Sequence, residues 1–281
     1  MANDSSAREI AFVLGGGGVL GAAEVGMLAA LAERGVEPDL VLGTSIGAVN
    51  GAMYAAEPGA AGVERLRLLW RDVDALWAGS ALQRLTTLAR TRTYLQPFGE
   101  VRDRLAGMLP VQRVEELAVP FQCVAASIER AAEHWFTEGP LAEVVLASCA
   151  VPGVLPPVRV GDEHFIDGGI VNSIPVSRAV LLGARTIYVL QVGRLEQSLR
   201  PPRWPWEVGL VAFEVARRHR FAHDLNSLPD GVELHVLPTG GSVAPAYNDL
   251  SAPLRLRRLA GTVQRQIDSA YDASLQYLKE H

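Results

Sequence analysis

A serine stands between two glycines in the segment Gly43-Thr-Ser45-Ile-Gly47, which fits the G-x-S-x-G pattern of a serine nucleophile. The run Asp39–Leu42 before it predicts a short strand, and the segment Ile46–Ala56 after it predicts a helix. A sharp strand-to-helix turn projects the serine side chain, and glycines remove the Cβ atoms that would clash in so tight a bend. We therefore expect Ser45 to be a nucleophile. The alternative is a structural turn in which Ser45 caps the helix.

A run of glycines follows the first apolar segment of the chain, in the sequence Gly15-Gly-Gly-Gly-Val-Leu-Gly21. Such a loop exposes successive backbone N–H groups, which can stabilise the negative oxygen of a tetrahedral intermediate. The same loop satisfies the dinucleotide fingerprint G-x-G-x-x-G at Gly16, Gly18 and Gly21, with Asp39 about 20 residues further on. In that fingerprint the acidic residue ends the second strand, whereas Asp39 precedes the apolar run Leu40–Leu42, so nucleotide binding is the weaker interpretation.

An aspartate ends another apolar segment, in the sequence Phe165-Ile-Asp167-Gly-Gly169. A carboxylate is a weak base for a serine hydroxyl, so it helps only if it is held within hydrogen-bond reach in a water-poor site. The two glycines after it would let other backbone approach closely. Asp167 is therefore a candidate general base, and the alternative is that it caps a turn before the next helix.

The order of the predicted elements indicates an α/β fold. Strand, tight turn and helix follow one another twice between residues 10 and 56, which is typical of a parallel sheet with helices on its faces. Further strands are predicted at 120–126, 134–137, 186–192 and 232–237, with a hairpin over 158–166 and a C-terminal helix that carries Leu256, Leu259, Val263, Ile267 and Leu278. We expect a single three-layer domain over residues 1–281, with core motifs at about 8–192 and a C-terminal strand and helices at about 200–281.

Composition narrows the class of protein. The chain of 281 residues is 49% hydrophobic and 20% charged, which is a globular balance. Its formal net charge is -5 and no basic tract is interleaved with aromatics, so a nucleic-acid partner is not expected. Cys123 and Cys149 are too few for a disulfide framework. The chain begins without a signal-peptide pattern and has no apolar stretch of membrane-spanning length, so we expect a cytoplasmic protein that can touch membranes transiently.

Taken together and in this order, the three motifs resemble those of the patatin-like phospholipase family, and the resemblance covers most of the chain. The glycine-rich loop of that family is similar to Gly15–Gly21, and its G-x-S-x-G elbow is similar to Gly43–Gly47. The family's segment before the second motif resembles Ala147–Gly153, and its D-G-[AG] motif resembles Asp167–Gly169. The resemblance implies a patatin-like fold, with a central mostly parallel sheet flanked by helices.

The resemblance also implies roles for individual residues. Ser45 would be the nucleophile and Asp167 the general base that later returns the proton. The oxyanion donors would be the N–H groups of Gly16, Gly17 and Gly18, and the remaining motif glycines are Gly21, Gly43, Gly47, Gly168 and Gly169. The implied reaction is hydrolysis of acyl-lipid esters, of the phospholipase A, lysophospholipase or esterase type, without calcium or cofactor. Many family members carry Lys or Arg where this chain has Leu20, so a lysophospholipid, neutral lipid or simple ester is as plausible a substrate as a diacyl phospholipid.

The sequence gives weaker support to functions other than this hydrolase. A conventional triad needs a histidine, but none of the six histidines follows a clear strand end, and the pair His219 and His223 lacks the Glu of an HExxH metal site. Two alternatives remain open, namely a nucleotide-binding protein that uses Gly16–Gly21 and a catalytically silent scaffold of the same fold. Trp204 and Trp206 precede a predicted amphipathic helix and could form a lid, although packing under a proline-rich loop is the simpler interpretation.

Overall fold

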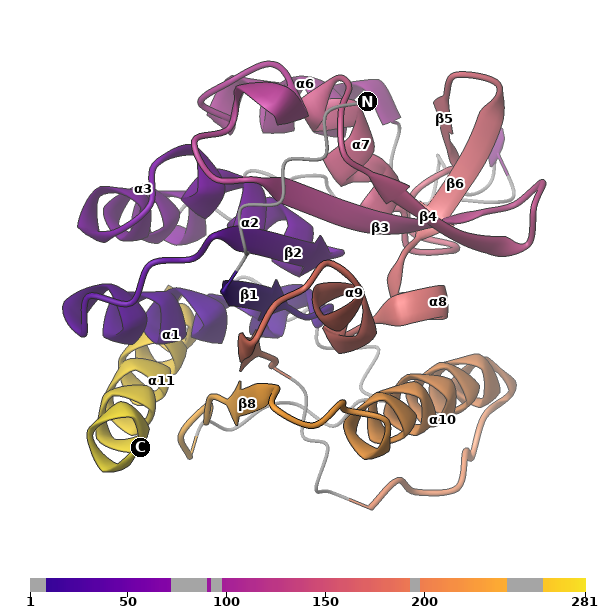
Figure 1. The fold of residues 1–281 in the computed structure, drawn as a ribbon. Coiled ribbons are helices and arrows are strands. Elements are labelled where there is room, and N and C mark those ends of the chain that lie inside the picture. Colours follow the sequence, from indigo (N-terminus) through magenta and orange to yellow (C-terminus); the bar gives the residue numbers. More distant parts are fainter. Residues whose placement is uncertain (1–8, 72–89, 92–97, 193–197, 242–259) are drawn as a thin grey trace.

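The computed structural model describes residues 9–71, 90–91, 98–192, 198–241 and 260–281. In this part of the chain an eight-stranded sheet has the order β5-β6-β3-β2-β1-β7-β8, with β4 paired to β3 (Figure 1). The strands are β1 (Ile10–Leu14), β2 (Leu40–Thr44), β3 (Phe121–Ser127), β4 (Ala132–Phe136), β5 (Val158–Val160), β6 (Glu163–Asp167), β7 (Thr186–Leu190) and β8 (Glu233–Val236).

Most of this sheet is parallel. The strands β3, β2, β1, β7 and β8 run in one direction, while β4, β5 and β6 pair antiparallel to their neighbours. The parallel strands are short and largely apolar because both of their faces are covered by helices. The predicted mostly parallel sheet is confirmed, and its antiparallel part includes the predicted hairpin, with Gly161 in the turn at φ 62°.

Helices cover both faces of the sheet, and side chains alternate along β1 to meet them. Phe12 and Leu14 pack in one apolar core with residues of α1, α2, α3, α7 and α11. Ala11 and Val13 pack in a second core with α9 and with Phe221 of α10. These two cores confirm the predicted three layers.

The helices are α1 (Ala22–Glu33), α2 (Ile46–Ala56), α3 (Ala60–Arg71), α6 (Phe98–Met108), α7 (Leu141–Ser148), α8 (Gly169–Asn172), α9 (Val176–Leu181), α10 (Pro205–Asn226) and α11 (Ala260–Glu280), with 3-10 turns η1 (Gly18–Gly21) and η2 (Val114–Glu116).

Two strands from distant parts of the chain end beside each other on one edge of β3. β4 pairs with the stretch of β3 from Cys123 to Ser127, so β2 and β6 must share the opposite edge. The last residue of β2, Thr44, lies opposite Val124, and the last residue of β6, Asp167, lies opposite Ala125. Because their partners are consecutive residues, the two strand ends meet head to head. This arrangement brings the segments after β2 and β6 together.

A few elements differ from the sequence prediction. The short helix α8 directly after β6 was not predicted, since its leading glycine gives no helical signal. α10 begins at Pro205, so Trp206, which was predicted to precede this helix, lies within it. Pro140 is the N-cap of α7. Leu256 and Leu259, which were assigned to the last helix, lie outside the described residues.

Candidate active site

The elbow between β2 and α2 projects Ser45 from a strained turn. Ser45 has φ 53° and ψ -124°, and a positive φ is uncommon for a residue with a side chain. A Cβ at Gly43 would lie 2.5 Å from Ala48 Cα, and one at Gly47 would lie 2.4 Å from the Leu14 carbonyl oxygen. Neighbouring backbone therefore leaves room for glycine alone at both positions. Ser45 does occupy the N-cap position of α2, but its hydroxyl makes no capping bond to the helix, so that hydroxyl is left for another partner.

The hydroxyl of Ser45 is hydrogen-bonded to the carboxylate of Asp167. Ser45 Oγ donates to Asp167 Oδ2 at 2.6 Å, although the two residues are 122 positions apart. The other carboxylate oxygen, Oδ1, accepts the Gly169 N–H at 2.7 Å. Asp167 thus does cap the turn before α8, but with one oxygen only, and the second oxygen is left for Ser45. A Cβ at Gly168 would lie 2.1 Å from the Val124 carbonyl oxygen, so glycine lets this turn lie against β3.

The Asp167 carboxylate sits in a dry environment. Its side chain is buried, and burial raises its pKa from 3.8 to about 6, while the hydrogen bonds from Ser45 and Gly169 lower the pKa in part. In the described part of the chain, no basic side chain forms an ion pair with Asp167 to offset this effect of burial. A carboxylate with a pKa near 6 is a stronger base than an ordinary one and is still ionised at neutral pH.

The glycine-rich loop lies directly against the nucleophile. A Cβ built on Gly16 would be 3.5 Å from Ser45 Cβ. The Gly16 N–H, however, donates to the Ser173 carbonyl oxygen at 2.9 Å, so in this structure it is not available to an oxyanion. Within the described residues, the N–H groups of Gly17 and Gly18 donate no hydrogen bond. A Cβ at Gly17 would lie 2.0 Å from Val192, so a residue with a side chain does not fit at this position of the loop.

The comparison with protein families agrees with this geometry. Residues 12–180 match the family described as patatin-like phospholipase, and this stretch includes the glycine-rich loop, the elbow and Asp167. The chain belongs to the patatin-like phospholipase family. Its place in that family fits the order of the three motifs along the chain.

Several curated proteins are related to this patatin-like chain. It is 33% identical over 192 residues to patatin-like phospholipase domain-containing protein ZK370.4 of Caenorhabditis elegans, a match that covers 67% of this chain and 14% of that protein. It is 34% identical over 191 residues to the human patatin-like phospholipase domain-containing protein 6, with the same two coverages, 67% and 14%. An uncharacterized NTE family protein of Mycobacterium tuberculosis is 34% identical over 178 residues, covering 62% of this chain and 46% of that protein. The chain therefore spans only a small part of the first two relatives.

A solved structure shares the patatin-like fold with this chain. VipD from Legionella pneumophila superposes with a TM-score of 0.50 at 15% sequence identity, covering 98% of this chain and 67% of VipD. The superposition supports the architecture of the chain. At this sequence identity it says nothing about the substrate.

The six histidines of this patatin-like chain are all described, and none of them bonds to Ser45. The His134 ring lies tilted against Phe165, and His235 contacts Glu233 and Tyr277 at the β8 edge of the sheet. His164 is bonded to an exposed glutamate. Among the described residues, no group of three or more His, Cys, Asp or Glu side chains is arranged to hold a metal ion. The Ser45 hydroxyl is bonded to the Asp167 carboxylate, and the buried Cys149 thiol also lies within hydrogen-bond reach of Ser45.

Asp39 lies at the amino-terminal end of the parallel strands, whereas the glycine-rich loop lies at their carboxyl-terminal end. Its Oδ2 accepts the Ile10 N–H at 2.9 Å, and its own N–H donates to the Ile10 carbonyl oxygen at 2.9 Å. Ile10 begins β1, whereas the glycine-rich loop follows the end of β1. An acidic residue one strand length away from the loop cannot hold the ribose of a nucleotide bound there. The fingerprint at Gly16, Gly18 and Gly21 is therefore left without Asp39 as its ribose-binding acid, which weakens the nucleotide interpretation further.

Two residues next to the dyad were given no role by the sequence prediction. Ser148, the last residue of α7, accepts the Ser45 N–H at 2.9 Å. Cys149 is buried beside Ser45 and Asp167, and burial together with that carboxylate raises the pKa of its thiol well above the usual value. Cys149 therefore stays a neutral thiol and does not compete with Ser45 as a nucleophile. Both residues lie in the segment Ala147–Gly153, which resembles the family, but their contacts with the dyad depend on the tertiary structure.

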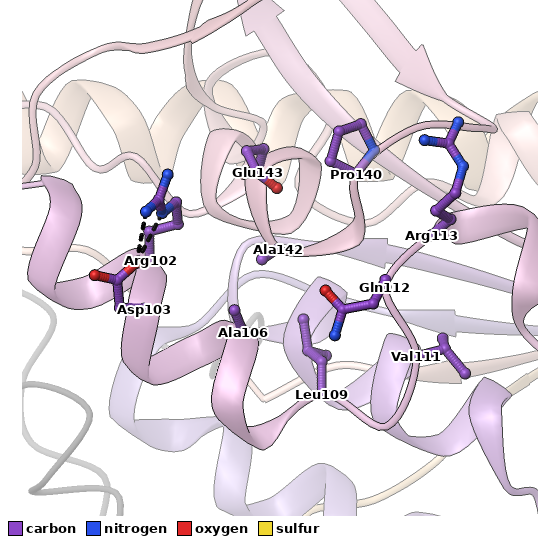
Figure 2. Close-up of a pocket in the computed structure, with 10 residues that line it drawn as sticks. All are labelled: Arg102, Asp103, Ala106, Leu109, Val111, Gln112, Arg113, Pro140, Ala142 and Glu143. Carbon is purple, nitrogen blue, oxygen red and sulfur yellow. Dashed lines mark hydrogen bonds and ion pairs between the residues drawn. The ribbon is translucent and has the colours of Figure 1, made fainter.

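A separate pocket of about 440 Å³ lies between α6 and the start of α7. Figure 2 shows Arg102 turned toward Asp103 at its rim, and these side chains form an ion pair at 2.7 Å. Arg113, also at the rim, pairs with Glu115 at 2.6 Å. The lining residues include no Ser, Thr, Cys or His, so this pocket lacks the nucleophile that the elbow provides.

Proposed function

We propose that this chain hydrolyses carboxylic esters of acyl lipids, with Ser45 as nucleophile and Asp167 as general base. The observation that carries the proposal is the 2.6 Å hydrogen bond from Ser45 Oγ to the buried Asp167 carboxylate. Membership of the patatin-like phospholipase family supports the lipid class of the substrate. The proposed activity is of the phospholipase A, lysophospholipase or esterase type.

The proposed first half-reaction forms an acyl-enzyme. Asp167 takes the proton from Ser45 as Oγ attacks the ester carbonyl carbon, and the carbonyl oxygen becomes an oxyanion. The N–H groups of Gly17 and Gly18 are the proposed donors to that oxyanion, because the Gly16 N–H is already bonded to Ser173. When the tetrahedral intermediate collapses, the C–O bond of the ester breaks and Asp167 returns the proton to the leaving alcohol.

The second half-reaction uses the same groups in reverse. Asp167 accepts a proton from a water molecule, and the resulting hydroxide attacks the acyl-Ser45 carbonyl. Collapse of this second intermediate releases the fatty acid, and the proton goes back to Ser45 Oγ. Every proton transfer in the scheme has a donor and an acceptor within this chain or the substrate, so we propose that turnover proceeds without calcium and without a cofactor.

An apolar substrate suits the surroundings of the dyad. Residue 20 in η1 is a leucine that packs against the apolar core. The glycine-rich loop therefore carries no cation at this position for a phosphate head group. Phe213 of α10 reaches Gly169, because a Cβ there would lie 3.0 Å both from Asp167 Oδ1 and from Phe213 Cζ. The described helices include none that could cross a bilayer. We propose transient contact with a lipid surface on the side of α10, because Phe213 of that helix reaches the turn after Asp167.

The lid hypothesis belongs to this proposal. Trp204 precedes α10 and is 57% exposed, while the side chain of Trp206 lies outside the described residues. If the two tryptophans serve a lid or wedge, replacing both should lower activity on micelles and spare short soluble esters. An equal loss on both substrates would contradict a lid.

The decisive test is labelling by a fluorophosphonate probe, followed by hydrolysis of p-nitrophenyl esters of increasing chain length. We expect wild type to be labelled and to turn over esters in the presence of a calcium chelator, and Ser45→Ala to lose both properties. Ser227→Ala is the control, because Ser227 is an exposed serine that caps the end of α10. Labelling that persists in Ser45→Ala would exclude Ser45 as nucleophile. A folded wild-type protein without any ester turnover would support the silent scaffold instead.

A further inference from the structure

The end of α7 is bonded to both halves of the dyad. Ser148 Oγ accepts the Ser45 N–H at 2.9 Å, and the Ser148 carbonyl oxygen accepts the Gly168 N–H at 3.2 Å. Two residues on, the Ala150 carbonyl oxygen accepts the Asp167 N–H at 3.0 Å. A single turn of backbone therefore holds the elbow on one side and the aspartate loop on the other.

The Ser148 hydroxyl can act in only one direction in this network. It is fully buried and donates its single O–H to the Val124 carbonyl oxygen at 2.6 Å. With its hydrogen committed there, the Oγ lone pairs are free to accept, and one of them takes the Ser45 N–H. Val124 lies opposite Thr44 in the β2–β3 pairing, so the hydroxyl ties the elbow to β3 one residue after that pairing ends.

This tie acts at the most strained point of the elbow. Ser45 keeps its positive φ only if surrounding contacts over-determine its conformation. Without the Ser148 hydroxyl, the part-buried Ser45 N–H would lose its partner, and a small backbone rotation would relieve both the strain and the missing bond. Such a rotation would swing Oγ away from Asp167, because Oγ is attached to the same residue.

We propose that Ser148 is a positioning residue, whose hydroxyl fixes the Ser45 backbone so that Oγ stays within reach of Asp167. This inference rests on the proposed hydrolase function. It also means that the Ser45 N–H is not an oxyanion donor, since Ser148 already accepts it. Oxyanion stabilisation is then left to the glycine-rich loop.

The effect of losing this tie has a signature in the pH profile. The hydrogen bond from Ser45 is one of the two that lower the pKa of Asp167. If Ser45 moves away, that bond weakens and the kinetic pKa of kcat/KM should rise. A variant that is merely less stable would keep the kinetic pKa of its folded fraction unchanged.

The test compares Ser148→Ala with a matched control, Ser127→Ala. Ser127 is also a buried serine on this side of the sheet that accepts a backbone N–H, from Arg130 at 3.2 Å, and donates at 2.6 Å, to Glu163. We expect Ser148→Ala to lower kcat about 10²-fold, since a displacement of about 1 Å can have that effect. KM should stay within about twofold, the kinetic pKa should rise and the fluorophosphonate rate should fall in parallel. Ser127→Ala should change none of these quantities.

Ser148→Cys provides a second variant, because a thiol nearly keeps the volume of the side chain but is a weak hydrogen-bond partner. We expect its kcat and kinetic pKa to lie between those of wild type and Ser148→Ala. Wild-type kcat and kinetic pKa in both folded Ser148 variants, or in Ser148→Cys alone if Ser148→Ala does not fold, would overturn the positioning role. An equal kcat loss in Ser127→Ala would overturn it too. Absence of turnover and labelling in wild type would instead overturn the proposed function, and this inference with it.

Discussion

Two acidic side chains lie at opposite ends of β6 in opposite environments. At the start of the strand, the backbone N–H and the imidazole of His164 bond to the exposed Glu129, and these bonds hold the pKa of that carboxyl at about 2. At the end of the strand, burial raises the pKa of Asp167 to about 6. The same type of group is thus a very weak base at one end and a usable one at the other.

The difference shows what turns a carboxylate into a partner for a serine. Glu129 is stabilised by two hydrogen bonds from His164 and by open solvent, so it has little tendency to accept a proton. Asp167 also accepts two hydrogen bonds, but its carboxylate is buried, so its charged form is less stable and its proton affinity is higher. Glycine turns let the buried end pack tightly, whereas the exposed end is finished by ordinary surface contacts.

The largest expected effect is on catalysis, and it separates the two ends directly. Asp167→Asn should lower kcat/KM by about 10³-fold, because general base catalysis contributes about 10²–10⁴-fold and an amide cannot accept the proton. Glu129→Gln, at the other end, should stay within about twofold of wild type. Both values come from steady-state hydrolysis of a p-nitrophenyl ester. A similar loss in the two variants would abolish the contrast between the ends.

The stability of the same variant should change in the opposite direction. The folded pKa of Asp167, about 6, lies above the ordinary value of 3.8, so the folded state binds the proton more tightly than the unfolded chain does. The contribution of Asp167 to wild-type stability is therefore fully present below pH 4 and is lost as the pH rises through 6, by up to about 3 kcal/mol. Asp167→Asn carries no such charge, so its unfolding free energy relative to wild type should be higher at pH 8 than at pH 4. Urea unfolding at the two pH values measures this, and a difference that does not depend on pH would contradict it.

The glycines of the two ends should also respond differently to a methyl group. In Gly168→Ala the new Cβ would lie 2.1 Å from the Val124 carbonyl oxygen, so backbone must move, and we expect a loss of about 2–3 kcal/mol in unfolding free energy. Gly161 in the hairpin turn has φ 62° and open space around it, so Gly161→Ala should lose only about 1 kcal/mol, from the positive φ. Chemical denaturation compares the pair. Equal losses would mean that the aspartate turn is no more tightly packed than the hairpin.

The sequence could predict each end of the site separately but not their meeting. The elbow at Ser45 and the turn after Asp167 have local patterns, because tight bends need glycine and buried strands need apolar residues. The head-to-head ends of β2 and β6 depend on pairing with β3, from a third part of the chain, and no local pattern specifies that register. For the same reason, the bond that occupies the Gly16 N–H and the contacts of Ser148 were not predicted. Asp39 had the spacing of a nucleotide-binding residue, but β1 and β2 run in the same direction. Asp39 therefore lies at the start of these strands, and the glycine-rich loop lies at the other end.

The smallest effect expected is the dependence of activity on pH, and it tests the environment of Asp167 without any mutation. Asp167 must be ionised to accept the Ser45 proton, so kcat/KM should be constant above pH 7 and decline as the pH falls through about 6. At pH 5 about one molecule in ten keeps the ionised carboxylate, so the rate should be about tenfold below the plateau. Glu129→Gln should leave the midpoint unchanged, since Glu129 is already ionised throughout this range. A profile that stays flat down to pH 4.5 would mean that the carboxylate is as well solvated as those at the exposed end of β6, and the contrast that gives Asp167 its basicity would be lost.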